Sequence, residues 1–287
     1  MSKAPSTFGL LEPFQYEFFR NGMLAAVLVG ALCGLIGVYI VLRGMSYIGH
    51  GLSHAIFGGA VVAFVMTWNF YLGAGAWGFI AAVLINQTAR RTKINADAAI
   101  GVVTTASFAI GIALVSRYRN FTRSFDAALF GNVLGVTPRD VLAIAAVLLM
   151  VGFIIFFGYR QLLFSTFDAE VAAVYGVRTQ WVETLFALVL AAAIIASMQI
   201  LGVTLIAAAL VIPAITARLL TDSFNRMLLL STLCGALTGF FGMYLSYYVD
   251  VASGASIVLL QASVFGAALS AVSLQKRVGS RLLRTLQ

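Results

Sequence analysis

The chain has 287 residues, of which 61% are hydrophobic and only 10% are charged, and its mean hydropathy is +1.00. Water-soluble domains carry about 25% charged residues, so this composition excludes a soluble domain. The net charge of +8 does not indicate a nucleic-acid partner, because no basic cluster is interleaved with stacking aromatic residues. An excess of Lys and Arg is instead typical of the cytoplasmic ends of membrane helices.

Apolar runs of the length that crosses a bilayer as a helix recur along the whole chain. We expect helices over nine segments: 22–42, 47–68, 74–89, 97–116, 140–159, 182–198, 200–220, 227–249 and 256–274. The sequence therefore predicts an all-α, polytopic membrane protein with one transmembrane domain, residues 1–287, and nine transmembrane helices. Eight is the alternative, because 74–89 is short and only the turn MQILG separates 182–198 from 200–220.

The basic residues predict an orientation for these helices. Twelve of the 18 Lys and Arg residues fall at one set of helix ends, which the positive-inside rule makes cytoplasmic. The other six are Lys3, Arg20, Arg117, Arg119, Arg123 and Arg139. With nine spans the C-terminus is cytoplasmic and the N-terminus is outside, although the four arginines between residues 117 and 139 oppose this orientation.

A short polar-ended segment on the predicted cytoplasmic side indicates a further helix, over about 168–176. Asp168 is a good N-cap, Glu170 adds negative charge to the first turn, and Gly176 suits the position after the last turn. The helix is too short to span the membrane, so it is either an interfacial connector or a docking helix for a cytoplasmic partner. None of the three lysines follows a glycine, which excludes a P-loop, so ATP-driven transport would need a second protein.

The two histidines of the chain, His50 and His54, lie four residues apart in an apolar stretch. This spacing places both imidazoles on one helix face, as when a helix supplies two nitrogens to a metal ion. The alternative is a pair of structural histidines that donate hydrogen bonds to neighbouring helices. Gly49 and Gly51 flank His50, which favours an interrupted helix lining a cavity and equally suits close helix packing. Because residue 51 is Gly, the H-E-x-x-H motif of a metalloprotease is absent, and we expect no enzyme activity.

Asp250 lies at the outer end of the eighth predicted span. It is either a solvated carboxylate at the end of a loop or a hard oxygen donor that attracts or binds a cation near an outer mouth.

Several stretches together resemble one known family. They are GMSYIGHGLSHAIFGGAVVAF, DAAIGVVTTASFAIGI, FDAEVAAVYGV, ILGVTLIAAALVIPAITARLL and GMYLSYYVDVASGASIVL, in chain order. They are similar to segments of the zinc/manganese-type permeases, the membrane-spanning subunits of ABC metal importers. The similarity runs from about residue 10 to about residue 275.

The resemblance implies a fold like that of the vitamin B12 and siderophore permeases, in a prokaryotic plasma (inner) membrane. It implies three kinds of partner besides membrane lipid: cytoplasmic ATPase subunits, an extracytoplasmic metal-binding protein and a second permease copy, in a homodimer or pseudo-dimer. ATP would bind the partner subunit, and no cofactor would be bound permanently. The family segment that contacts the ATPase matches Phe167, Asp168, Glu170, Ala172 and Gly176.

By position, His54 matches the histidine of the family and Asp250 matches its late aspartate, whereas His50 stands where the family has an aspartate. Exchanging a hard oxygen for a nitrogen favours zinc over manganese as the transported divalent ion. An importer for manganese or iron is the alternative, as is a permease for a metal chelate or cobalamin, which would have a wide vestibule and no dependence on histidine. An ion-coupled carrier would need acidic relays and inverted repeats, and the sequence has neither.

Overall fold

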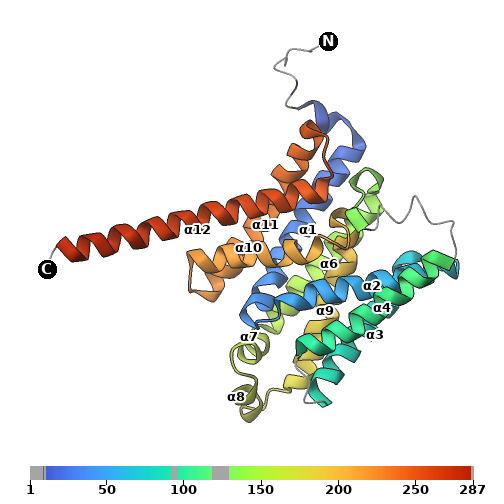
Figure 1. Ribbon diagram of the computed structural model, residues 1–287, viewed down its shortest axis with the longest axis horizontal. Helices are drawn as coiled ribbons and strands as arrows, with labels where there is room; N and C mark the ends of the chain where they lie inside the picture. Colours follow the sequence, from blue (N-terminus) through green and yellow to red (C-terminus); the bar gives the residue numbers. More distant parts are fainter. Residues whose placement is uncertain (1–8, 10, 92–95, 118–128, 286–287) are drawn as a thin grey trace.

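The computed structural model describes residue 9 and residues 11–91, 96–117 and 129–285, and within these ranges it contains helices and no strands (Figure 1). The long helices are α1 (Glu17–Leu42), α2 (Ser46–Val65), α3 (Phe70–Arg91), α4 (Ala96–Arg117), α6 (Pro138–Phe157), α9 (Thr179–Leu201), α10 (Ile206–Leu220), α11 (Phe224–Val249) and α12 (Ser253–Thr285). The short ones are η1 (Glu12–Gln15), η2 (Val133–Gly135), α7 (Tyr159–Phe167) and α8 (Ala169–Val174). Each of the nine predicted segments falls on a long helix, and the all-α membrane fold is confirmed.

Six of these helices are long and apolar enough to cross a membrane: α1, α2, α6, α9, α11 and α12 over Ser253–Gln275. The apolar parts of α3, α4 and α10 are shorter, at Leu72–Thr88, Ala98–Leu114 and Ile206–Leu220. The number of spans, nine or eight, therefore stays a prediction. The orientation also stays a prediction. Of the basic residues on which it rests, four lie outside the described residues: Lys3, Lys93, Arg119 and Arg123.

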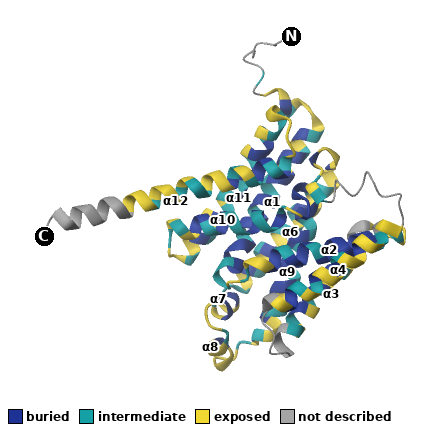
Figure 2. Ribbon diagram, in the orientation of Figure 1, coloured by how far each residue is buried: buried dark blue, intermediate teal, exposed yellow. Residues whose placement is uncertain are grey.

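The centre of the molecule is built on α1, which packs antiparallel to α11. Glycines let the two backbones touch: a Cβ on Gly30 would collide with the carbonyl of Gly235, and a Cβ on Gly34 would collide with that of Ser231. The Ser231 hydroxyl also donates a hydrogen bond to the Gly34 carbonyl oxygen at 2.6 Å. Small residues of this kind are typical of close helix pairs in membranes. Buried residues accordingly concentrate on α1, α2 and α9 (Figure 2).

Helices α2, α3 and α4 form a second group beside this centre (Figure 1). Here the predicted interruption of α2 is wrong, because α2 is continuous through Gly49 and Gly51. The glycines of α2 serve packing instead: a Cβ on Gly51 would collide with Ile100 of α4, and one on Gly59 would collide with Trp77 of α3. Tight contact with two neighbours outweighs the low intrinsic helix propensity of glycine.

Helix α12 projects away from the other helices (Figure 1), and much of its surface is exposed (Figure 2). One side of its first turns is buried, at Ser256, Ile257 and Gln261, whereas Leu259 in the same turns and Leu274 further along are exposed. An apolar surface of this kind suits lipid or another protein chain. The second permease copy stays a prediction.

Candidate functional site

The structure brings His50 and His54 together on α2. Their ring centroids lie 4.5 Å apart with the planes at 75°. The His54 ring also meets the edge of Phe108 on α4, at 4.7 Å, and the His50 ring lies 5.5 Å from Tyr47. The pair is therefore held on one face of α2 among aromatic side chains.

One nitrogen of this pair makes no hydrogen bond within the described residues. Within the described residues, His54 Nδ1 is buried and has no hydrogen-bond partner. A buried polar atom without a partner costs about 1–3 kcal/mol, and native proteins keep few of them. Binding a metal ion would satisfy this atom.

Asp250 lies apart from the histidines. It caps α11 in the left-handed conformation, with φ 56° and ψ 46°, and its side chain is exposed. Since α11 runs antiparallel to α1, Asp250 lies near the beginning of α1, whereas α2 and its histidines follow the end of α1. Among the described residues of one chain, no three His, Cys, Asp or Glu side chains are close enough to hold a metal ion together. The role of Asp250 at an outer mouth stays a prediction.

Helix α8 forms in the segment where the sequence predicts a short helix. The Asp168 carboxylate accepts a hydrogen bond from the Val171 amide at 2.9 Å, as an N-cap does. After the last turn, Gly176 adopts φ +82°, and its amide donates to the Ala173 carbonyl at 3.0 Å. These two contacts close both ends of a helix of six residues, which is too short to be stable alone.

The two faces of α8 differ sharply. Ala172 has no exposed surface, because it packs against the protein itself. The outward apolar side chains are Val171, Val174 at 86% exposure and Tyr175 at 76%, and Phe167 at the end of α7 is 64% exposed. Asp168 and Glu170 are exposed beside them. The outward apolar surface therefore consists of Phe167, Val171, Val174 and Tyr175, while Ala172 faces the protein.

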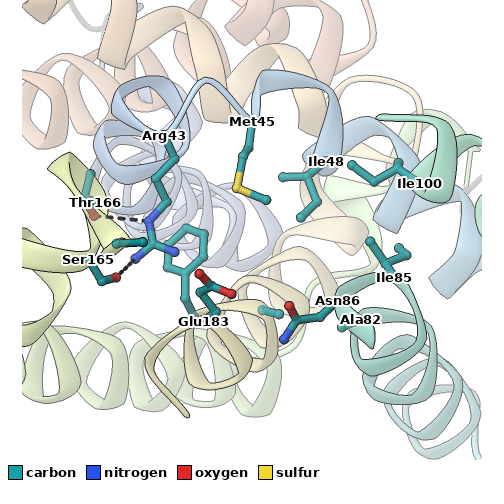
Figure 3. A pocket seen from close by; sticks show the side chains of 13 residues that line it. Arg43, Met45, Ile48, Ala82, Ile85, Asn86, Ile100, Ser165, Thr166 and Glu183 are labelled. Atoms are coloured by element: carbon teal, nitrogen blue, oxygen red, sulfur yellow. Dashed lines mark hydrogen bonds between the residues drawn. The ribbon is translucent and has the colours of Figure 1, made fainter. Parts of the chain in front are cut away.

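Arg43, directly after α1, makes a set of contacts that the sequence did not single out (Figure 3). Its Nε donates to Thr166 Oγ1 at 3.1 Å and its Nη2 donates to Ser165 Oγ at 3.0 Å. The guanidinium carbon lies 4.3 Å from the ring centroid of Phe186 on α9. Burial lowers the pKa of Arg43, and the negative charge of Glu183 opposes this shift.

A cavity of about 340 Å³ lies next to Arg43 (Figure 3). Its walls come from α2, α3, α4, α7, α8 and α9 and from the turn between α1 and α2. The lining residues are Arg43, Met45, Ile48, Ala82, Ile85, Asn86, Ile100, Ser165, Thr166, Ala169, Glu183, Phe186 and Ala187. Ile48 of α2, the helix that carries the histidines, and Ala169 of α8 thus line the same pocket.

The described helices form a bundle in which six are long and apolar enough to cross a membrane, which is the architecture of a polytopic membrane protein. The sequence matches the profile of the ABC 3 transport family over residues 15–272, and the chain belongs to this family. It is 38% identical to the manganese transport system membrane protein MntC of Halalkalibacterium halodurans, over 91% of this chain and 90% of that protein. It is 34% identical to the chelated iron transport system membrane protein YfeC of Yersinia pestis, over 89% of this chain and 87% of that one.

Solved structures agree with this assignment. The fold matches PsaBC from Streptococcus pneumoniae, solved in complex with a Fab, with a TM-score of 0.81 and 33% identity over 90% of this chain and 94% of that chain. A metal-chelate type ABC transporter in an inward-facing conformation has a TM-score of 0.72 at 17% identity, over 94% and 91% of the two chains, which shows the fold alone. The chain is thus a multi-pass plasma-membrane permease subunit of an ABC transporter, in which ATP hydrolysis resides in a separate subunit.

Proposed function

We propose that this permease imports a divalent first-row transition-metal ion, which binds transiently at His50 and His54 on its way through the membrane. The observation that carries the proposal is the contact between the two rings, together with the buried Nδ1 of His54 that has no hydrogen-bond partner in the described residues. Neutral imidazole is a ligand for such ions. A transport site must bind strongly enough to admit the ion and weakly enough to release it, so a site with few protein ligands fits.

Two metals are candidates, and different observations favour them. Two imidazoles that no carboxylate joins among the described residues favour zinc, because nitrogen donors suit zinc better than manganese. The names of the relatives, which describe manganese and iron transport, favour those ions. We propose zinc as the preferred ion on the chemistry of the donors, with manganese or iron as the second candidate.

The partners follow from the two ends of the molecule. We propose that the exposed apolar side chains of Phe167, Val171, Val174 and Tyr175 dock into a groove of a cytoplasmic ATPase subunit. In this proposal the C-terminus is cytoplasmic and Asp250 lies at the outer mouth, where an extracytoplasmic metal-binding protein would deliver the ion. A second copy of the permease would complete the transporter. All of these roles belong to one permease domain, residues 1–287, in a prokaryotic inner membrane.

A change of metal preference tests this function. We expect His50→Asp to shift uptake from zinc toward manganese, because it sets a hard oxygen beside His54. His50→Asn is the matched control, since it has the same shape without the charge and should lower uptake of both ions. The measurement is competition between zinc and manganese during uptake into vesicles that contain the permease and its partners. A folded His50→Asp transporter with unaltered preference would contradict the ligand role of His50.

A further inference from the structure

Arg43 stands in the turn that joins α1 to α2, the helix of both histidines. The amides of the two residues after Arg43 donate back to carbonyls in the last turn of α1, at 3.2 and 3.0 Å, in a Schellman motif. Gly44 has φ +66° there, and a Cβ on it would meet nothing within 4 Å, so this position needs glycine for its backbone conformation. The direction of α2 is thus tied to Arg43, and His50 lies about 6 Å along the helix from Ser46.

The other end of the Arg43 side chain is held by the last turn of α7. Ser165 and Thr166, which accept its two hydrogen bonds, are each only 8% exposed. The Thr166 hydroxyl donates its own proton to the Leu162 carbonyl at 2.6 Å, so its oxygen is oriented as an acceptor for Arg43. A fork that engages two fixed acceptors resists rotation as well as separation.

Thr166 is only two residues from Asp168, which ends α7 and begins α8. The Asp168 amide donates to the Phe164 carbonyl at 3.0 Å, while its carboxylate caps α8. A displacement of α8 therefore reaches the last turn of α7 through a continuous, hydrogen-bonded chain. From there it passes to Arg43, whose guanidinium also lies over Phe186.

The cavity beside Arg43 leaves room for the helix that a displacement of α8 would move. Ile48 of α2 and Ala187 of α9 both line this pocket, which is partly open, so their side chains lack protein packing partners on that side. A bundle packed to normal density would transmit motion through many contacts. Here the space permits movement of α2, and the polar fork of Arg43 crosses its margin (Figure 3).

We propose that Arg43 is the positioning residue that transmits movement of α8 to the histidine-bearing start of α2, so that ATP use in the partner subunit changes the metal site. This inference rests on the proposed function, because it takes α8 as the ATPase docking helix. Arg43 itself touches neither the metal nor ATP. Without Arg43, ATP hydrolysis and metal uptake should both continue, but less metal should be imported for each ATP hydrolysed.

The test compares ATP hydrolysis and metal uptake in the same proteoliposomes, which contain the complete permease–ATPase complex. For Arg43→Gln and Arg43→Lys we expect ATP hydrolysis to persist while zinc or manganese imported per ATP falls about tenfold, within the usual range of coupling between sites. Lysine keeps the charge but cannot form the fork. The control is Arg226→Gln, at an exposed arginine near the start of α11. A parallel fall in both activities, or an unchanged ratio, would overturn the proposal.

If the Arg43 variants fail to fold, the double variant Ser165→Ala, Thr166→Val removes only the acceptors and leaves Arg43 in place. The same fall in metal per ATP supports the proposal, and an unchanged ratio overturns it.

A second measurement does not depend on which ion is transported. Spin labels at Tyr47→Cys on α2 and Leu233→Cys on α11, both exposed positions, would report movement of α2 against the central helices in a background without native cysteines. We expect ATP to change this distance in the parent protein and not in Arg43→Gln. Absence of metal uptake by the parent complex, with this distance change intact, would contradict the proposed function and leave Arg43 as the link. An ATP-dependent change that persists in Arg43→Gln would refute the link.

Discussion

The middle of α1 and its C-terminal end are packed in different ways. Along its length, α1 meets α11 through glycines, with backbone against backbone at Gly30 and Gly34. At its end, Arg43 meets α7 and α9 through two hydrogen bonds and an aromatic ring, beside a cavity of about 340 Å³. The first contact leaves no space between the helices, whereas the second borders an open space. A transporter needs both, because a moving part requires a fixed frame to move against.

Physical chemistry accounts for the difference. Membrane helices gain little from hydrophobic burial against each other, so close packing of small residues supplies much of their association. Such a contact loses about a quarter to a half of its attraction when the helices separate by about 0.5–1 Å. The hydrogen bonds of Arg43 instead hold the end of α1 to the last turn of α7, and the pocket beside them leaves room for α2 to move. We infer that α1 and α11 form the frame and that α2 moves relative to it.

The largest effect is expected where the frame is broken. Gly30→Leu places a side chain against the backbone of Gly235, so the permease should lose about 3 kcal/mol or more of folding free energy and fail to yield a monodisperse product. Gly152→Leu in α6 is the control, because nothing lies within 4 Å of its Cβ position. Thermal unfolding in detergent, followed by size-exclusion chromatography, measures both. Equal melting temperatures for the two variants would contradict a rigid contact between α1 and α11.

The next effect concerns the site at the start of the movable helix. His50→Ala and His54→Ala should each lower metal uptake at least about tenfold, and the double variant should be little worse, because groups that act as one unit are not additive. Tyr47→Phe, which keeps a neighbouring ring, is the control. Uptake into vesicles at several metal concentrations gives the rates. A double variant whose loss equals the product of the single losses would indicate two independent roles.

Much of the fold could be predicted from the sequence, because apolar runs long enough for membrane helices stand out from composition alone. The continuity of α2 could not, since Gly49 and Gly51 are poor helix formers in isolation. What keeps α2 helical is contact with residues such as Ile100, and such contacts are invisible to local propensity. The bounds of α12 were missed for a similar reason, because its apolar run ends near residue 274 while the helix continues to Thr285.

The site was predictable only where its parts are close in sequence. The spacing of His50 and His54 placed them on one face, and their rings do lie together. Arg43 escaped notice because Ser165 and Thr166 are 122 and 123 positions away. The orientation of α8 was equally out of reach, because only its packing against the protein shows that Ala172 points inward while Tyr175 points outward.

A smaller effect is expected from filling the space beside Arg43. Ala187→Leu adds apolar volume to the cavity, so the protein should fold with unchanged or higher stability while metal imported per ATP falls about fivefold, since residues between coupled sites contribute about 0.5–2 kcal/mol. Ala192→Leu is the control on the same helix, because it lines a different cavity, with Gln199 and Asp140. Melting temperature and uptake are measured together. If Ala187→Leu imports metal at the normal ratio, movement into this space is not needed.

The smallest effect is expected at the far end of the frame. Asp250→Asn removes one exposed negative charge and keeps the backbone, because asparagine also accepts the left-handed conformation found there. A single charge in water attracts a cation weakly and is screened by salt, so uptake should fall about twofold at low metal and low ionic strength, and recover at high metal. Asp222→Asn, an exposed acid at the opposite end of α11, should change nothing. If both variants lower uptake equally, or if the loss at Asp250 persists at saturating metal, Asp250 does not act by concentrating cations at the outer mouth.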